Sequence, residues 1–199
     1  MIQHTFQRAR IILASGSPRR QYLLKELGLR FEIIPPDITE DYPGGFSPAE
    51  VARYLAEKKA DSFDPFRLDE TTVILSADTL VIFNGEILGK PSGHREAMQM
   101  LKKLSGNRHE VITGVCLRSL QKKTVFHVES AVYFKPLSDA EISYYIQHFR
   151  PFDKAGGYGV QEWIGYIGIS KIEGSFFNIM GLPVKEVYEA LLENYSYLC

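Results

Sequence analysis

A strand, a loop and a helix are predicted in succession by residues 11–28, IILASGSPRRQYLLKELG. The apolar run IILA is typical of a buried strand, and the polar SGS that follows it is typical of a loop. Ser17 can cap the helix, and Pro18 stands where its missing N–H is harmless. The leucines of QYLLKEL fall on one helix face, and Gly28 is typical of a helix end.

The same alternation of strand-like and helix-like segments continues along the chain and predicts an α/β fold. Asn84-Gly85, between two apolar runs, predicts a hairpin. No internal repeat or low-complexity tract interrupts the pattern, so we expect one or two compact units. The other predicted strands cover residues 72–77, 80–83, 111–117, 125–134 and 165–171, and the other predicted helices cover 47–62, 95–104, 139–148 and a segment from 183.

Composition argues against several classes of protein. The 199 residues are 45% hydrophobic and 24% charged, which is enough for a sizeable core. Their formal net charge of -1 gives no bulk attraction to nucleic acid or to anionic lipid, so we expect neither partner. Cys116 and Cys199 have neither disulfide-framework nor metal-ligand spacing. Because IILA is too short to span a membrane, we expect a cytoplasmic protein in a reducing compartment.

Two arginines break a local rule of helix electrostatics. Arg19 and Arg20 occupy the first turn of the predicted helix, where the helix dipole disfavours each cation by about 0.3–1 kcal/mol. Such violations are expected at functional sites. Together with Ser15, Gly16 and the N–H groups of the helix start, the arginines predict an anion cradle, and phosphate is the expected anion. The alternative is that both arginines project into water or pair with acids elsewhere.

Three acids are candidates for a metal-assisted phosphoryl reaction. Asp78 interrupts an apolar run, Glu40 lies in a loop-like segment, and Asp153 opens a glycine-rich stretch. Mg²⁺ is usually held by one or two carboxylates together with substrate phosphates. Each acid also has a simpler interpretation as a cap, a turn former or a solvated charge.

Lysines and an amide add further candidates. Lys90 and Lys154 stand beside Gly or Pro, in loops from which an ammonium can reach phosphate oxygens. For Lys59, a solvated lysine is the simpler interpretation. Gln161 can offer an amide donor and acceptor to a base edge. The five histidines show no zinc-ligand spacing, and the sequence contains no Walker or dinucleotide fingerprint.

Six motifs follow one another in a characteristic order. They are SGSPRR (15–20), Lys59-Ala60, SADT (76–79), GKP (89–91), TGV (113–115) and DKAGGYGVQ (153–161). In this order they resemble the Maf family of nucleoside triphosphate pyrophosphatases. The resemblance runs from residue 11 to about residue 195, and SGSPRR together with DKAGGYGVQ is its most specific part.

The resemblance implies both a fold and an activity. The fold is one α/β domain over residues 1–199, similar to the inosine-triphosphate pyrophosphatase superfamily, with a long mixed sheet flanked by helices and two lobes around a cleft. The activity is hydrolysis of nucleoside triphosphates to monophosphate and pyrophosphate with a divalent cation, Mg²⁺ or Mn²⁺, in a homodimer. The Arg-Arg pair, Thr79 and Tyr-Gly-Val-Gln resemble the branch that acts on dTTP and UTP, and modified pyrimidine nucleotides are further candidates.

The resemblance also implies a role for each matched residue. Asp78 matches the proton acceptor, and the positions linked to substrate specificity are Arg19, Thr79 and Gln161. Phosphate binding is expected of Ser15, Arg20, Lys59, Lys90 and Lys154, and metal binding of Glu40, Asp78 and Asp153. The chain departs from the family pattern at Gly157 and at Glu162-Trp163.

Two other functions stay open on the sequence. A nucleotide-sensing regulator of cell division would bind a nucleotide in the same cradle without turnover. Carboxylates that face phosphates gain little without a metal, which favours the enzyme. A phosphatase would release orthophosphate instead of pyrophosphate.

Overall fold

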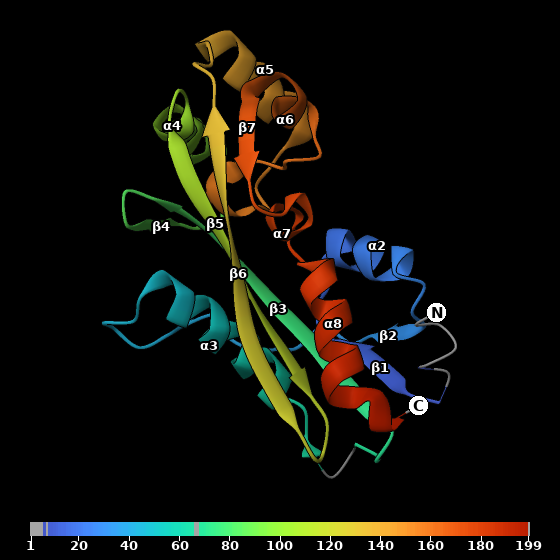
Figure 1. Cartoon of the computed structure of the whole chain (residues 1–199). Coiled ribbons are helices and arrows are strands. Elements are labelled where there is room, and N and C mark those ends of the chain that lie inside the picture. The colour runs from blue at the N-terminus through green and yellow to red at the C-terminus, as the bar shows by residue number, and fades with distance from the viewer. Residues whose placement is uncertain (1–5, 7, 66–67, 199) are drawn as a thin grey trace. The chain divides into compact units, whose positions relative to one another are not determined.

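The computed structural model describes residues 6, 8–65 and 68–198 and confirms a mixed α/β fold whose sheet is flanked by helices (Figure 1). Within these residues the sheet has seven strands, ordered β2-β1-β3-β5-β6-β7, with β4 paired to β3. β1 runs parallel to β2 and β3, whereas the β3–β4 and β6–β7 pairs are antiparallel. The strands are β1 (Arg10–Leu13), β2 (Phe31–Ile33), β3 (Thr72–Phe83), β4 (Glu86–Leu88), β5 (Arg108–Arg118), β6 (Lys123–Phe134) and β7 (Ile169–Glu173). The helices are α2 (Pro18–Glu26), α3 (Pro48–Asp61), α4 (His94–Leu104), α5 (Asp139–Phe149), α6 (Trp163–Gly168), α7 (Phe176–Met180) and α8 (Val184–Tyr195).

The chain divides into two compact units. Unit 1 comprises Met1–Asp78, Thr113–Val128 and Gly181–Cys199, and unit 2 comprises Thr79–Ile112 and Glu129–Met180. β3, β5 and β6 each contribute residues to both units. Each unit is therefore assembled from stretches that lie far apart in the sequence. The cleft that the family resemblance implies stays a prediction.

The strands of unit 1 are covered on both faces. Parallel strands need crossover connections, and α2 and α3 provide them before β2 and β3. Figure 1 shows α3 on one side of these strands and α2 and α8 on the other. This explains why β1 is apolar along most of its length instead of alternating with polar residues. One core cluster joins α3 to the strands and contains Ile12, Ala14, Ala56, Ala60, Ile74 and Cys116. Cys199 lies outside the described residues.

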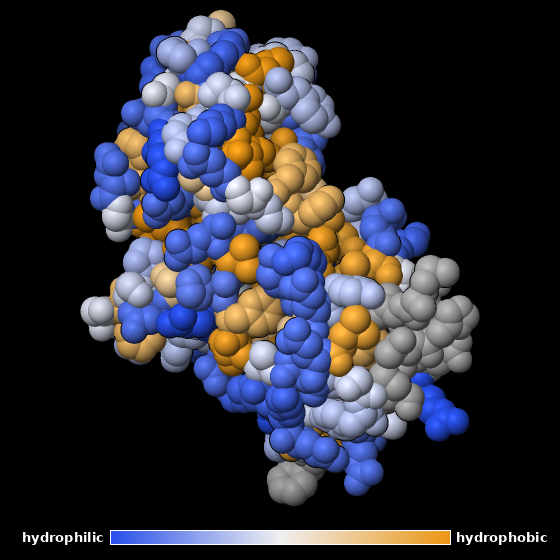
Figure 2. All heavy atoms as spheres, viewed as in Figure 1, coloured by the Kyte–Doolittle hydropathy of each residue, from blue (hydrophilic) through white to orange (hydrophobic). Residues whose placement is uncertain are grey.

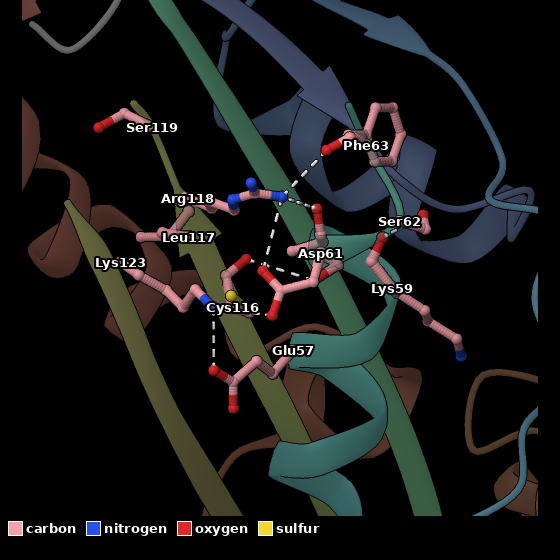
Figure 3. Close-up of polar contacts among 12 residues, drawn as sticks. Glu57, Lys59, Asp61, Ser62, Phe63, Cys116, Leu117, Arg118, Ser119 and Lys123 are labelled. Atoms are coloured by element: carbon pink, nitrogen blue, oxygen red, sulfur yellow. Dashed lines mark hydrogen bonds and ion pairs between the residues drawn. The ribbon is translucent and has the colours of Figure 1, made fainter. Parts of the chain in front are cut away.

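The C-terminal end of α3 is tied to β5 and β6 by charged side chains (Figure 3). Arg118 donates to the carbonyl oxygens of Ala60 (2.8 Å) and Phe63 (3.2 Å), where a helix end leaves carbonyl groups without intrahelical partners. Lys123 bridges the carboxylates of Glu57 (3.0 Å) and Asp61 (2.7 Å). The side chain of Lys59 points away from this group in Figure 3. These contacts therefore hold the end of α3 against β5 and β6, and the Lys59 side chain is directed toward another part of unit 1.

Unit 2 contains the predicted hairpin and a helix with a complete N-terminal cap. Asn84 (φ 50) and Gly85 (φ 80) form the hairpin turn between β3 and β4, with two positive φ values as a type I′ turn requires. Ser138 and Glu141 form a complete capping box at the start of α5. The sequence predicted the hairpin and a helix from residue 139 because both depend on contacts between residues only a few positions apart.

The structure differs from several local predictions. β3 is a single strand, so Asp78 lies inside it and not after it. Ser17 stands at the N-cap of α2, but its side chain makes no capping hydrogen bond to the described backbone. β2 and α7 have three and five residues, and neither was predicted. Segments this short carry too few residues to show a period.

Residues 165–168 form the last four residues of α6 and not the start of a strand. The Glu162 carbonyl accepts hydrogen bonds from the amides of Gly165 (2.8 Å) and Tyr166 (3.2 Å), as in a helical turn. A Cβ on Gly165 would lie 2.0 Å from the carbonyl oxygen of Val160, so the tight turn depends on glycine at this position. The strand β7 starts only at Ile169.

Hydrophilic residues cover much of the face drawn in Figure 2, with smaller hydrophobic patches among them. Among the described residues, no helix is both long and apolar enough to cross a membrane.

Candidate active site

The loop that follows β1 is held together by Arg20. The Arg20 side chain donates to Ser15 Oγ (3.2 Å) and to the carbonyl oxygen of Gly181 (2.8 Å), and the Ser17 amide also donates to Ser15 Oγ (3.2 Å). Burial lowers the pKa of the Arg20 guanidinium from its ordinary value, and the charge of Asp78 opposes that shift. Arg20 therefore does not simply project into water. Its neighbour Arg19 is half-buried.

Lys59 lies between two carboxylates of unit 1. Its ammonium donates to Glu40 Oε1 (2.8 Å) and to Asp78 Oδ1. Lys59 is 8% exposed and Asp78 is 7% exposed, whereas Glu40 is exposed. The interpretation of Lys59 as a solvated lysine is therefore wrong. Acids and lysines are almost never this buried unless they are paired, and each of these two supplies the other's partner.

The same carboxylates are a suitable donor set for a divalent cation. Glu40 and Asp78 already converge on one positive charge, and Mg²⁺ needs only one or two carboxylates when phosphates supply further oxygens. Among the described residues, no group of three or more His, Cys, Asp or Glu side chains is arranged to hold a metal. The third predicted donor, Asp153, belongs to unit 2 and accepts a hydrogen bond from Lys154 (2.7 Å). The residues present thus fit a cation held jointly with substrate.

The glycine-rich segment of unit 2 holds a second buried lysine. Lys154 is 8% exposed, and its ammonium lies 2.7 Å from Asp153 Oδ1 and 3.2 Å from Glu162 Oε1. The amide of Gly156 donates to the carbonyl oxygen of Gly89 (3.0 Å). This bond joins the DKAGG segment to the GKP segment, which carries the exposed Lys90.

The predicted specificity residues are divided between the two units. Arg19 belongs to unit 1, and Thr79 and Gln161 belong to unit 2. Thr79 and Gln161 are both half-buried. Gln161 Oε1 is buried and has no hydrogen-bond partner among the described residues, so a strong acceptor is left to be satisfied there.

Sequence reasoning missed three groups around these lysines and arginines. The Gly181 carbonyl meets Arg20 across 161 positions, and no local pattern announces such a contact. Glu162 was noted only as a departure from a family pattern, although it contacts Lys154. Tyr145 was not among the predicted site residues, yet it is fully buried and donates its hydroxyl to Glu162. Buried polar partners of this kind become visible only in three dimensions.

Comparison with known proteins gives consistent matches over most of the chain. The family model described as Maf-like protein matches residues 10–194. A dTTP/UTP pyrophosphatase of Porphyromonas gingivalis is 50% identical over 184 residues, which cover 92% of this chain and 92% of that protein. A dTTP/UTP pyrophosphatase of Flavobacterium johnsoniae is 45% identical over 191 residues, covering 96% and 98%. Among solved structures, the Staphylococcus aureus Ham1 protein matches with a TM-score of 0.43 and 16% identity, over 63% of this chain and 71% of that one.

Proposed function

The chain belongs to the Maf family, and from this premise we propose that it hydrolyses dTTP and UTP to the nucleoside monophosphate and pyrophosphate. Modified pyrimidine nucleotides are further candidate substrates. The observation that carries the proposal is the contact of the buried Lys59 with Asp78 and Glu40, two acids whose charges both act on the pKa of Arg20. This arrangement combines cations that suit a triphosphate with a carboxylate that can take a proton.

The cations of the site bind the phosphates. Ser15 and Arg20 are already connected by a hydrogen bond, so the loop after β1 offers a hydroxyl and a guanidinium from one rigid segment. Arginine suits phosphate because its N–H groups form a planar fork, and lysine acts as a point charge. Further positive charge comes from Arg19, Lys59, Lys90 and Lys154.

Asp78 is the proton acceptor in the proposed reaction. Water attacks the α-phosphorus, a P–O bond forms to that water, and the bond from the α-phosphorus to the bridging oxygen breaks to release pyrophosphate. The water proton passes to Asp78, whose carboxylate is held in place by Lys59. Positioning and electrostatic stabilisation are the main sources of catalysis in phosphoryl transfer.

A divalent cation completes the proposed site. Glu40 and Asp78 would hold Mg²⁺ or Mn²⁺ together with phosphate oxygens, and Asp153 is the third proposed donor. When bound, the cation supplies charge neutralisation and polarises the phosphoryl oxygens. Lys59 occupies the space between the two carboxylates of unit 1, so its ammonium must share them with the cation.

Base recognition is proposed for Arg19, Thr79 and Gln161. The buried Oε1 of Gln161 can accept a hydrogen bond from the N3–H group that thymine and uracil share. Thymine and uracil differ only in the methyl group on C5, which is separated from N3 by C4, so a hydrogen bond to N3–H fits both bases. This contact is therefore compatible with one enzyme acting on dTTP and UTP.

The test is product identification with a panel of nucleoside triphosphates. We expect pyrophosphate and monophosphate from dTTP and UTP in the presence of Mg²⁺ or Mn²⁺, and much less from dCTP or GTP. Asp78→Asn protein, purified in the same way, controls for contaminating hydrolases. Orthophosphate as the product would indicate a phosphatase. Tight binding of dTTP without turnover would indicate the nucleotide-sensing regulator.

The quaternary structure and location of the enzyme are part of the same proposal. We expect a homodimer in the cytoplasm, without nucleic acid or membrane as a partner. Light scattering on the purified protein measures its mass, and a value of one chain, 22.6 kDa, would contradict the dimer.

A further inference from the structure

We propose that Glu162, fixed by Tyr145, is a positioning residue that orients the Lys154 ammonium toward a substrate phosphate. The inference rests on the proposed function, because it takes Lys154 as a phosphate-binding residue. Neither the phosphate-binding set nor the metal-binding set proposed above contains Glu162 or Tyr145. Tyr145, Lys154 and Glu162 all belong to unit 2.

The two oxygens of the Glu162 carboxylate have different partners. Oε1 lies 3.2 Å from the Lys154 ammonium, and Oε2 accepts the hydrogen bond of the Tyr145 hydroxyl. The hydroxyl oxygen of Tyr145 accepts in turn from the amide of Gly159 (3.0 Å). A chain of contacts thus runs from helix α5 through Glu162 to Lys154.

The backbone of Glu162 is as firmly held as its side chain. Its amide donates to the carbonyl oxygen of Gly159 (3.0 Å), and its own carbonyl starts α6. A Cβ on Gly159 would lie 2.8 Å from the carboxyl carbon of Glu162, so the glycine leaves the space into which that carboxylate folds. The carboxylate therefore has little freedom to move away from the lysine.

Tyr145 is suited to be a permanent donor. It is fully buried on α5, and its ring stacks on Phe149 with 5.2 Å between ring centroids. Burial raises the pKa of the Tyr145 phenol above its ordinary value, and the hydrogen bond to Glu162 raises it further. The phenol consequently keeps its proton and holds the carboxylate in one orientation.

This fixed carboxylate limits how the lysine can point. The Lys154 ammonium donates one N–H group to Asp153 (2.7 Å) and forms an ion pair with Glu162 (3.2 Å), so the two carboxylates restrict the directions in which its remaining N–H groups can meet a phosphate oxygen. An unrestrained lysine would attract phosphate in many orientations, of which few suit the reaction. Glu162 therefore lowers the net charge around Lys154 but increases the precision of its contact.

The test is Glu162→Gln, which keeps the size of the side chain and its ability to accept from Tyr145 but removes the charge that faces Lys154. We expect kcat for dTTP to fall about tenfold, as for other residues that orient a ligand, while KM stays constant or falls. KM should not rise, because the variant has more net positive charge near the phosphates. Loss of a merely structural contact would raise KM or lower the melting temperature instead.

The matched control is Glu173→Gln. Glu173 also pairs with a lysine and a tyrosine, Lys171 Nζ (2.5 Å) and the Tyr133 hydroxyl (2.8 Å), but it is exposed on β7. We expect its kinetic constants to equal those of the wild type. If Glu162→Gln does not fold, Tyr145→Phe removes only the hydroxyl and should lower kcat about threefold in the same direction.

A double-mutant cycle decides whether Glu162 acts through Lys154. In a Lys154→Ala background, Glu162→Gln should have no further effect on kcat. An equal effect in both backgrounds, or wild-type kinetics for Glu162→Gln in an active enzyme, would overturn the inference alone. A wild-type protein that hydrolyses neither dTTP nor UTP would refute the proposed function, and the inference would fall with it.

Discussion

Among the described residues, each unit has a buried lysine that contacts two carboxylates, and the two groups are alike in composition but differ in how they are built. Both lysines are 8% exposed, and each meets one carboxylate that is well exposed and one that is largely buried. The unit 1 group is Lys59 with Glu40 and Asp78, and the unit 2 group is Lys154 with Asp153 and Glu162.

The two groups differ in where their parts come from. In unit 1 the lysine lies on α3, the buried acid lies in the middle of β3, and the exposed acid lies in a loop 19 residues before the lysine. In unit 2 the exposed acid is the residue next to the lysine, and the buried acid is only eight positions away and is fixed by a phenol from α5. Similar charge sets can therefore serve different purposes. We expect Asp78 of unit 1 to accept a proton in the reaction and Glu162 of unit 2 to position the Lys154 ammonium.

The sharpest way to break this comparison is to convert both buried acids to amides. Asp78→Asn should lower turnover by about 10²–10⁴-fold, because general-base assistance is lost, whereas Glu162→Gln should cost only about tenfold. Pyrophosphate release measures both, and thermal denaturation checks that both variants are folded. Equal losses for the two variants would contradict the division of roles.

Low pH should reduce the stability of the protein through His109 of unit 2. Unit 1 has no buried histidine among its described residues. His109 is buried, its Nε2 lies 2.7 Å from the Tyr158 hydroxyl oxygen, and burial lowers its pKa from 6.5 to about 4. Between these two values the unfolded chain binds more protons than the folded one, so stability falls as the pH falls. The free energy of unfolding should decrease by about 2 kcal/mol from pH 7 to pH 5 through this group.

Urea denaturation at the two pH values measures this loss. His109→Gln should remove most of the pH dependence, and the exposed His148→Gln serves as the matched control. If both variants keep the wild-type dependence, His109 is not its source.

The exposed acids of the two groups, Glu40 and Asp153, are both proposed metal donors, and their substitution tests which unit binds the cation. Glu40→Gln should raise the Mn²⁺ concentration needed for half-maximal activity about tenfold, because one proposed donor is lost. Binding of Mn²⁺, followed by electron paramagnetic resonance, should weaken in parallel. Asp153→Asn tests the third proposed donor in the same way, and an unchanged Mn²⁺ requirement would restrict the protein donors to unit 1.

Local signals in the sequence predicted much of the fold. The starts of α3 and α5 and the Asn84-Gly85 turn depend on contacts between residues a few positions apart, and all three lie where the sequence predicted them. Residues 165–168 of α6 were predicted as part of a strand because the helix is short. Its turn also depends on the close approach of Gly165 to the backbone of Val160. Such a fit is a property of two packed backbones and leaves no period in the sequence.

The site was predictable by residue type but not by contact. The motifs indicated Lys59 and Asp78, and the family resemblance implied Glu40, yet the burial of Lys59 follows from partners at positions 40 and 78 that converge only in the folded unit. Lys59 was interpreted as solvated because it lies next to Lys58 in the last turn of a helix, where lysines are usually exposed. Glu162 was even less predictable, because its significance depends on a phenol from another helix.

The contact between Arg20 and Gly181 has a consequence for synthesis of the protein. Gly181, whose carbonyl oxygen accepts from Arg20, is synthesised 161 residues after Arg20. At a translation rate of about 5–20 residues per second this interval is roughly 8 to 32 seconds. α8, whose Tyr195 hydroxyl donates to the Leu117 carbonyl oxygen (2.6 Å), arrives later still. The nascent chain thus carries the loop after β1 without this contact until translation is almost complete, and a product terminated before Gly181 would lack the contact altogether.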